Sequence, residues 1–327
     1  MQLAVVIASL ARDRSSLAVG NVIGSTISNI LGAFSLGLLT HKQGIKFDRS
    51  SRIYSALLLL VATFATPLIY FPRKHLWIVC GSILLALFVL YVASVAWAIG
   101  RGKVTAPEGS DSDSSDDDSS DSDSDDNHNV PSETIERTNL GQNGVPPGPQ
   151  ALVLAELSSQ RPVATPPEPR RTRHRLRYHV GFLFLGFLSI CLAGYVLSHA
   201  ATTITDQFGI SDVLFGVIIL ALATTLPEKF IAVLSGFRGH AGIMVANTAG
   251  SNIFLLLLCM GIIMVQTEGD LDGGSVKIPE LCVMWGSTLA FTATIWFGGR
   301  WSRWVGGAML ACYIAFIILE FTVIHRV

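Results

Sequence analysis

The chain has 327 residues, of which half are hydrophobic and 14% are charged, and its net charge is −1. The apolar residues fall in long blocks rather than in short alternating runs, which excludes a soluble globular class and predicts an all-α integral membrane protein. Charges are segregated into one acidic loop and basic span ends, so we expect the lipid bilayer as a partner and no nucleic acid.

Eight segments are long enough to cross a membrane as helices, and a shorter apolar piece opens the chain. That piece lacks the basic start of a signal peptide, so we expect it to be an N-terminal helix stub whose beginning is missing from the written sequence. A first membrane region (1–99), a loop (100–177) and a second membrane region (178–327) result. The predicted spans are 17–40, 53–72, 75–99, 178–200, 211–235, 241–265, 276–298 and 303–324.

The first predicted span carries Asn21, Ser25 and Asn29 at every fourth position, so these side chains form one polar stripe on an apolar helix. Gly20 and Gly24 have GxxxG spacing, which lets another backbone approach closely. Helix packing alone explains the glycines, but two buried amides need more partners than packing provides. The stripe is therefore a candidate ion-binding element.

Residues 100–177 are polar and rich in Ser, Asp and Pro, a composition that cannot bury enough apolar area to fold and predicts a disordered loop. The run at 110–126 interleaves serine with aspartate, as substrates of an acid-directed kinase do. A solvated tether is the alternative. The loop ends in a basic run, Arg170–Arg177, directly before a span, which suits anionic lipid at a cytosolic face.

In the second half, Glu228 lies near the middle of a long apolar run, directly after Pro227 and on the same helical face as Thr224 and Thr225. A charged group at that depth in hydrocarbon is expensive to hold and indicates a functional site. Because proline has no N–H, the carbonyl near Ala223 loses its helical partner and is free to face a ligand. Pro227 is thus a predicted helix breaker beside a cation site.

Further along, Asn247 and Ser251 are four residues apart and share a helical face, with Asn252 beside them. All of these groups offer oxygen rather than sulfur or imidazole, which favours Ca²⁺ or Na⁺ with Glu228 as the charged metal ligand. Contacts between helices are the alternative for the hydroxyls and amides. An ion pair with Lys229 is the alternative for Glu228, although Lys229 points about 100° away around the helix.

The two polar elements are copies of one another, because a shift of 226 positions carries VGNVIGSTISN onto VANTAGSNIFL. The shift superimposes Asn21 on Asn247 and Ser25 on Ser251. It also brings Gln2 onto Glu228, so the first copy begins near the position of the key carboxylate in the second. Repeats of this kind in transporters mark a binding site at their interface.

Most Lys and Arg residues fall in loops that an alternation of eight spans places on one side of the membrane, and that side should be cytosolic. The opposite loops include the acidic residues Glu268, Asp270 and Asp272. The basic loops are 41–52, 100–177, 236–242 and 299–303.

The stretches TTLPEKFIAVLSG and NTAGSNIF, with GNVIGSTISNIL in the first half, resemble the two α-repeats of the sodium/calcium exchanger (cation/Ca²⁺ antiporter) superfamily. The resemblance implies an inverted-repeat transporter fold of ten helices, with cation sites at mid-membrane where the second and third helices of each repeat meet. The motif positions that it implies as cation ligands are Thr224, Thr225, Glu228, Ser251, Ser25 and Asn29, and Asn21, Asn247 and Asn252 lie in the same motifs.

The chain departs from that family at three points. The first helix and most of the second are absent, Gln2 stands where the family usually has an acid, and Leu255 stands where it has Asn or Asp. A divalent ion facing one carboxylate leaves an uncompensated charge in a low dielectric. The chain as written should therefore bind Ca²⁺ poorly, or favour a monovalent ion or a proton at Glu228, and we expect that its written start is not the native start.

These observations predict a transporter rather than an enzyme, namely a secondary active antiporter that exchanges Ca²⁺ for Na⁺ or H⁺ by alternating access and needs no cofactor. The plasma membrane and a vacuolar or other endomembrane are both open. The alternative is a non-transporting exchanger remnant that acts as a scaffold or sensor through its acidic loop, which Gln2 and Leu255 favour. An intramembrane enzyme fits less well, because no pair of membrane aspartates and no matched Ser and His form a dyad.

Overall fold

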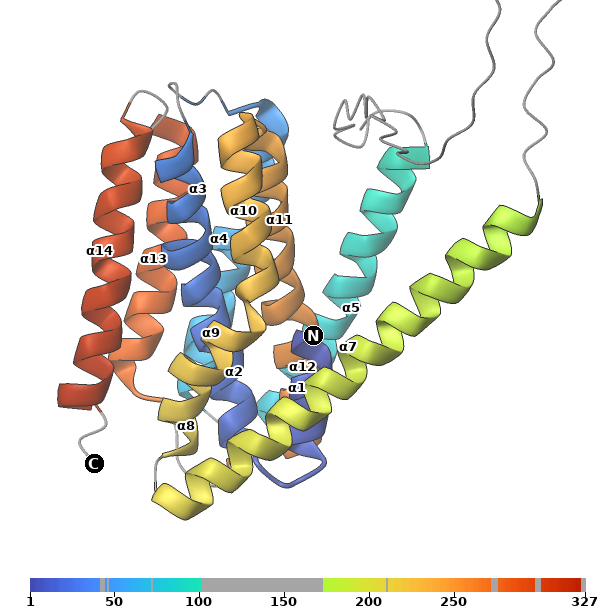
Figure 1. Cartoon of the computed structure of the whole chain (residues 1–327). Helices are drawn as coiled ribbons and strands as arrows, with labels where there is room; N and C mark the ends of the chain where they lie inside the picture. The colour runs from blue at the N-terminus through green and yellow to red at the C-terminus, as the bar shows by residue number, and fades with distance from the viewer. Residues whose placement is uncertain are drawn as a thin grey trace, which may run out of the picture. The chain divides into compact units, whose positions relative to one another are not determined.

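The computed structural model describes residues 1–41, 45, 47–71, 73–100, 173–209, 211–271, 276–297 and 301–324. Within these ranges the regular secondary structure is entirely helical (Figure 1). The elements are α1 (Gln2–Leu10), α2 (Ser15–Ile27), the π-helical η1 (Ser28–Phe34), α3 (Ser35–Thr40), α4 (Arg49–Tyr70), α5 (Lys74–Gly100), α7 (Arg173–Phe208), α8 (Asp212–Phe215), η2 (Gly216–Leu220), α9 (Ala221–Thr224), α10 (Leu226–Arg238), α11 (Ala241–Ile253), η3 (Phe254–Cys259), α12 (Met260–Thr267), α13 (Ile278–Phe297), α14 (Ser302–Leu319) and η4 (Glu320–Ile324).

Seven helices of the described residues are long and apolar enough to cross a membrane, and the bent pair Asp212–Thr224 and Leu226–Arg238 brings the number up to 8. These helices coincide with the eight predicted spans, and α1 is the predicted stub. The all-α membrane fold is therefore confirmed. Continuous α2, η1 and α3 form the central span, in which every residue from Ser15 to Ser35 is buried.

The internal repeat is visible in the elements themselves. Helix α2 begins at Ser15 and α11 begins at Ala241, while the π-helical turns begin at Ser28 and Phe254, so the same shift of 226 relates both pairs. The ends of α3 and α10 lie side by side, where the Thr40 hydroxyl donates to the Val233 carbonyl at 3.3 Å. By the shift of 226, α10 is the counterpart of α1, which runs opposite to α2 and α3 in the first copy. The two copies therefore run in opposite directions. The repeat is thus an inverted one (Figure 1).

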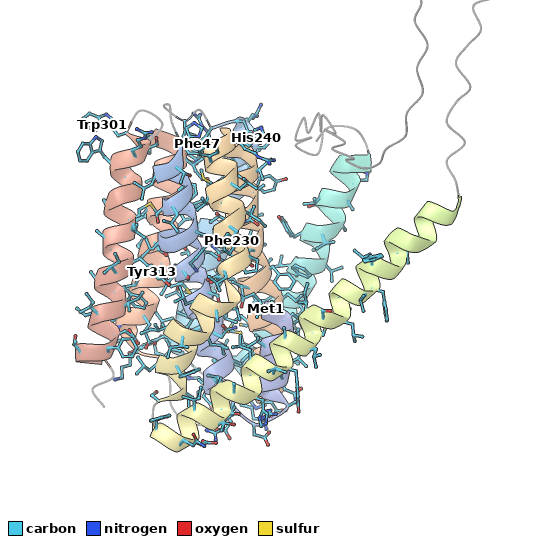
Figure 2. The ribbon with its side chains drawn as sticks, viewed as in Figure 1. Met1, Phe47, Phe230, His240, Trp301 and Tyr313 are labelled. Atoms are coloured by element: carbon cyan, nitrogen blue, oxygen red, sulfur yellow. The ribbon has the colours of Figure 1, made fainter. Side chains whose placement is uncertain are left out.

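Three of the predicted basic loops meet at one end of this membrane unit. His41 Nδ1 lies 3.1 Å from the Gly236 carbonyl, and Arg303 Nε donates to the His41 carbonyl at 2.9 Å. Phe47, His240 and Trp301 gather at this end in Figure 2. At the opposite end, Lys74 pairs with Glu268 at 2.5 Å. The described parts of the loops therefore alternate as the spans predict, and the cytosolic assignment of the basic end stays a prediction.

The α2 helix packs backbone to backbone against the segment that leads to Glu228. A Cβ atom added to Gly20 would lie 2.8 Å from the Val213 carbonyl oxygen, and one added to Gly24 would lie 2.0 Å from that of Val217. Only glycine permits this approach, as the GxxxG spacing predicts. The contact holds the polar stripe of the first copy against η2 and α9 of the second.

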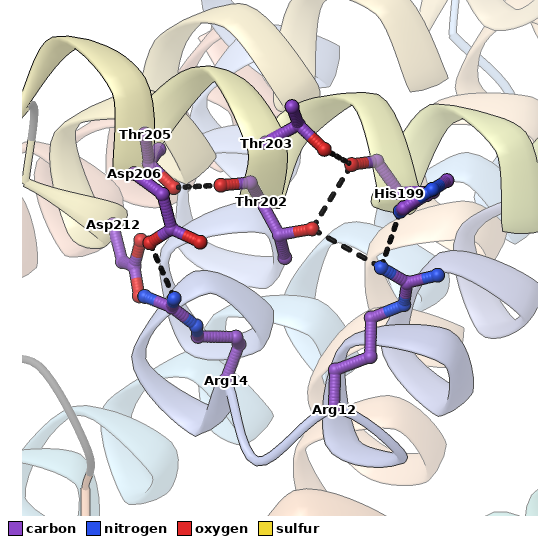
Figure 3. A network of polar contacts seen from close by, with 8 residues as sticks. All are labelled: Arg12, Arg14, His199, Thr202, Thr203, Thr205, Asp206 and Asp212. Carbon is purple, nitrogen blue, oxygen red and sulfur yellow. Dashed lines mark hydrogen bonds and ion pairs between the residues drawn. The ribbon is translucent and has the colours of Figure 1, made fainter.

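A polar network joins the turn between α1 and α2 to α7 and α8 (Figure 3). Arg14 forms ion pairs with Asp206 and with Asp212, the second at 3.1 Å. Arg12 reaches His199 and donates to the Thr202 hydroxyl at 3.3 Å. These contacts connect the turn between α1 and α2 of the first copy to α7 and α8, which precede the second copy in the sequence.

The glycine contact predicts a difference between two repeat-equivalent substitutions. Gly24→Ala places a methyl group against the Val217 backbone, so it should lower the free energy of unfolding by about 1–3 kcal/mol, as overpacking does. Gly250→Ala is the matched control, because a Cβ there meets no described atom within 4 Å. Thermal unfolding of both variants in detergent measures the effect, and equal midpoints would contradict the close packing.

Candidate cation site

The helix that contains Glu228 is broken directly before it. Helix α9 ends at Thr224, α10 begins at Leu226, and the segments on either side are bent by 49°. Pro227 occupies the first turn of α10, where a missing N–H is tolerated, and it leaves the carbonyl of Ala223 without the donor that a continuous helix would supply. The sequence therefore places the carboxylate at a break rather than along a regular helix.

In the first copy, three polar side chains close on one another. Gln2 Oε1 accepts hydrogen bonds from Asn21 Nδ2 and from the Ser25 hydroxyl, both at 3.2 Å. All three residues are buried. A neutral amide therefore fills the place that the repeat gives to a carboxylate in the second copy.

The equivalent residues of the second copy do not form such a hydrogen-bonded group of side chains. The Ser251 hydroxyl donates to the backbone carbonyl of Asn247 at 2.7 Å, not to a side chain. Glu228 Oε2 and Asn247 Nδ2 are buried, and neither has a hydrogen-bond partner among the described residues. Because buried polar atoms are nearly always satisfied, this carboxylate oxygen is the clearest candidate for a cation ligand.

Side chains of the two copies form hydrogen bonds with one another near the helix break. The hydroxyls of Ser25 and Thr224 lie 3.3 Å apart, and Asn29 Nδ2 reaches Ser251 Oγ at 3.3 Å and Asn252 Oδ1 at 3.1 Å. The interaction is one-sided, because Leu255, the counterpart of Asn29, is apolar and buried. Side chains with oxygen atoms from both copies thus lie on the elements next to the break.

Unsatisfied buried atoms are concentrated on these same elements. Amide oxygen and nitrogen are assigned from the hydrogen-bond network, so an amide turned over would present its oxygen at the same point. On α1, η1, α10 and α11, the buried atoms without a described partner are Gln2 Nε2, Asn29 Oδ1, Glu228 Oε2, Asn247 Nδ2, Thr248 Oγ1 and Asn252 Nδ2. Their number indicates a polar interior built for a ligand rather than for packing.

The sequence predicts Thr225 on the same helical face as Thr224 and Glu228, but its side chain does not join the cluster around Thr224. Its hydroxyl is 3.0 Å from Ser28 Oγ and accepts a hydrogen bond from Lys229, so it turns away from the cluster around Thr224. The reason is the break at Thr225 itself, where the backbone leaves the helical conformation at φ −97° and ψ 8°. Thr225 therefore belongs to a second polar cluster.

Sequence reasoning missed the other members of that second cluster. Lys229 Nζ donates to Ser28 Oγ at 2.8 Å, and the Tyr313 hydroxyl donates to the same oxygen at 3.0 Å. Lys229 could have been noticed as a charged residue inside an apolar run, and Ser28 as the neighbour of Asn29. Nothing in the sequence indicates that Tyr313 belongs to the cluster, because it lies 285 positions from Ser28.

The described residues contain no group of three His, Cys, Asp or Glu side chains that could hold a metal ion. The site consists instead of hydroxyls and amides around one carboxylate. Such a set offers the oxygen atoms that hard cations prefer as ligands.

A model of the sodium/calcium exchanger protein family matches residues 1–97 and 178–322. The chain belongs to this family. The family is described as the sodium/calcium exchanger proteins, and with its candidate spans the chain is a multi-pass integral membrane protein.

Among relatives of this exchanger-family chain, the putative antiporter CaxA of Alkalimonas amylolytica is 33% identical over 109 residues, which cover 33% of this chain and 34% of CaxA. The match therefore spans about a third of the relative's length. The solved structure of native YfkE has a TM-score of 0.60 at 17% identity, covering 98% of this chain and 79% of that one. The sodium-calcium exchanger NCX_Mj has a TM-score of 0.52 at 21% identity, with 97% and 82% covered. These likenesses establish the fold.

The second cluster predicts a large effect from one small substitution. Ser28→Ala removes the oxygen shared by Lys229, Thr225 and Tyr313, so it should lower the free energy of unfolding by about 1–3 kcal/mol. Ser94→Ala is the control, since that exposed hydroxyl donates within its own helix, to the Tyr91 carbonyl. Thermal unfolding in detergent compares the two, and a Ser28→Ala midpoint equal to that of Ser94→Ala would contradict the cluster.

Proposed function

We propose that this member of the exchanger family is a secondary active cation antiporter that exchanges Ca²⁺ for Na⁺ or H⁺. The observation that carries the proposal is Glu228, a carboxylate at a helix break between two inverted copies, with one buried oxygen that has no described partner. An ionisable group held there at such a cost is best explained by a charged ligand. The description of CaxA as a putative antiporter supports the same class of activity.

The cation would be bound by Glu228 together with neutral oxygens from both copies. Thr224 and Ser251 are hydroxyl ligands of the second copy, and Asn247 and Asn252 are its amides. Ser25, Asn29, Asn21 and Gln2 complete the site from the first copy. All are hard donors suited to Ca²⁺ and Na⁺.

The position of these residues supports alternating access. The contacts of Ser25 with Thr224 and of Asn29 with Ser251, both at 3.3 Å, are among the hydrogen bonds that join the copies. Rocking of one copy against the other would break such contacts and open the site to one side at a time. A bound cation would replace the lost hydrogen bonds with coordination, which couples occupancy to the motion.

Loss of the carboxylate should abolish transport. In vesicles reconstituted with the full chain, Glu228→Gln should reduce radioactive Ca²⁺ uptake driven by a Na⁺ or an H⁺ gradient by at least about tenfold, because the only charged ligand becomes neutral. Glu268→Gln is the matched control, a glutamate at the membrane boundary that pairs with Lys74. Thermal unfolding of Glu228→Gln verifies that the variant is folded. Uptake equal to that of the unchanged chain would exclude Glu228 as a ligand.

A second candidate function has its own support. Leu255 is fully buried where Asn29 stands in the first copy, and Lys229 brings a positive charge next to the only carboxylate of the site. Both features weaken Ca²⁺ binding and suit a non-transporting exchanger that acts as a scaffold or sensor through its acidic loop. Absence of uptake by the unchanged chain under both gradients would favour this alternative.

The loop contributes two proposed partners. The serine and aspartate run at 110–126 lies outside the described residues and is proposed as a substrate of an acid-directed kinase. The basic run Arg170–Arg177, whose last residues begin α7, is proposed to bind anionic lipid.

Deletion of 110–126 should leave gradient-driven Ca²⁺ uptake unchanged, because the run has no apolar residue that packs into the membrane unit. The deletion should instead abolish any change in uptake caused by phosphorylation. Uptake before and after treatment with an acid-directed kinase, with and without the deletion, measures both effects. Inactive vesicles after the deletion would make the run a structural element.

A further inference from the structure

Lys229 extends its ammonium group into the interior of the bundle instead of pairing with Glu228. Nζ donates to Ser28 Oγ at 2.8 Å and to the Thr225 hydroxyl. The Ser28 oxygen also accepts from Tyr313, which lies at mid-height of the bundle on α14 (Figure 2). The ammonium is therefore held by neutral hydroxyl oxygens of both copies.

Space for the lysine side chain is provided by a glycine on the facing helix. A Cβ atom added to Gly32 would lie 3.3 Å from Lys229 Cε and 3.4 Å from Tyr313 Cε1. Both distances lie at or just below the lower limit of ordinary van der Waals contact. A larger residue at position 32 would therefore crowd the aliphatic part of the Lys229 side chain. The pocket is fitted to this side chain.

The repeat does not require this arrangement. In the shift that relates the copies, Leu3 stands in place of Lys229 and Phe254 in place of Ser28. The first copy therefore has apolar residues where the second builds a hydroxyl-lined pocket around a charge. Packing of the shared scaffold accounts for the apolar pair but not for the lysine and its three hydroxyl neighbours.

A half-buried ammonium and a monovalent metal cation require the same surroundings. The lysine head is a compact point charge with three donors and no acceptor, and it is satisfied by oxygen atoms near 2.8 Å. Lys229 directly follows Glu228 in the sequence, so the two opposite charges attract one another without forming an ion pair, which lowers the cost of both groups in a low-dielectric interior. The lysine ammonium thus supplies these hydroxyl oxygens with the positive charge that a bound Na⁺ would otherwise supply.

We infer that Lys229 is a tethered cation that occupies a monovalent-cation position formed by the hydroxyls of Ser28 and Thr225. The inference rests on the proposed function and extends it. An exchanger built this way binds one monovalent ion fewer, and it binds a divalent ion more weakly, than the same site without the lysine.

The first test removes the tethered charge and supplies a free one. Full-length Lys229→Ala is purified, and its midpoint of thermal unfolding is measured in NaCl, propylammonium chloride and choline chloride at equal ionic strength. Propylammonium replaces the atoms that the substitution removes. Relative to choline, both cations should raise the midpoint of Lys229→Ala by at least about 4 °C more than that of the unchanged chain.

Two further proteins make the first test specific. Lys74→Ala, which removes an exposed lysine, should respond like the unchanged chain. Lys229→Ala combined with Ser28→Ala should lose the additional response, because it lacks the oxygen that holds the cation. An identical response of Lys229→Ala and the unchanged chain to both cations would overturn the inference.

The second test does not depend on whether Lys229→Ala folds. Lys229→Gln keeps a donor for Ser28 and Thr225 but removes the charge, so radioactive Ca²⁺ should bind at least about tenfold more tightly in equilibrium binding. Equal or weaker binding overturns the inference. If the proposed function is wrong, the unchanged chain shows no gradient-driven Ca²⁺ uptake in vesicles. The tests of Lys229 measure unfolding and binding without transport, so their outcome is separate from that failure.

Discussion

The contact between the backbones of α2 and η2 is the constraint on which the rest of the site depends. At Gly24 the two chains are so close that a methyl group has no room, and Ser25, the next residue, lies within hydrogen-bonding distance of Thr224. A bulkier residue at Gly24 would push α2 away from η2 and lengthen the hydrogen bonds between the copies, such as that of Ser25 with Thr224. In a membrane, where apolar surfaces gain little by associating, small residues of this kind decide which helices meet.

The two copies use the same scaffold for different electrostatic purposes. The first closes Gln2, Asn21 and Ser25 into a neutral, hydrogen-bonded group, whereas the second keeps Glu228 open and adds Lys229 nearby. A symmetric backbone therefore carries an asymmetric charge distribution. If the inverted copies exchange roles in the proposed transport cycle, this difference in charge would make the two directions of access unequal in energy.

The spans, the inverted repeat and the break near Pro227 could be predicted from the sequence, because hydrophobic length, a fixed shift and a missing N–H are local properties. The partners of individual site residues could not be predicted in the same way. Whether Thr225 faces Glu228 or Lys229 depends on the rotation of one helix after a 49° bend, and the approach of Tyr313 to Ser28 depends on how α14 packs. Such contacts are set by tertiary packing, which residue spacing alone does not determine.

The π-helical turns also have a consequence for what each copy can carry. A π-helical turn holds one residue more than an α-helical turn and so widens the helix. The turns at Ser28 and Phe254 begin at the same position of the two copies although their side chains differ. The widening therefore belongs to the backbone that the copies share, and this backbone accepts a polar side chain in one copy and an apolar one in the other.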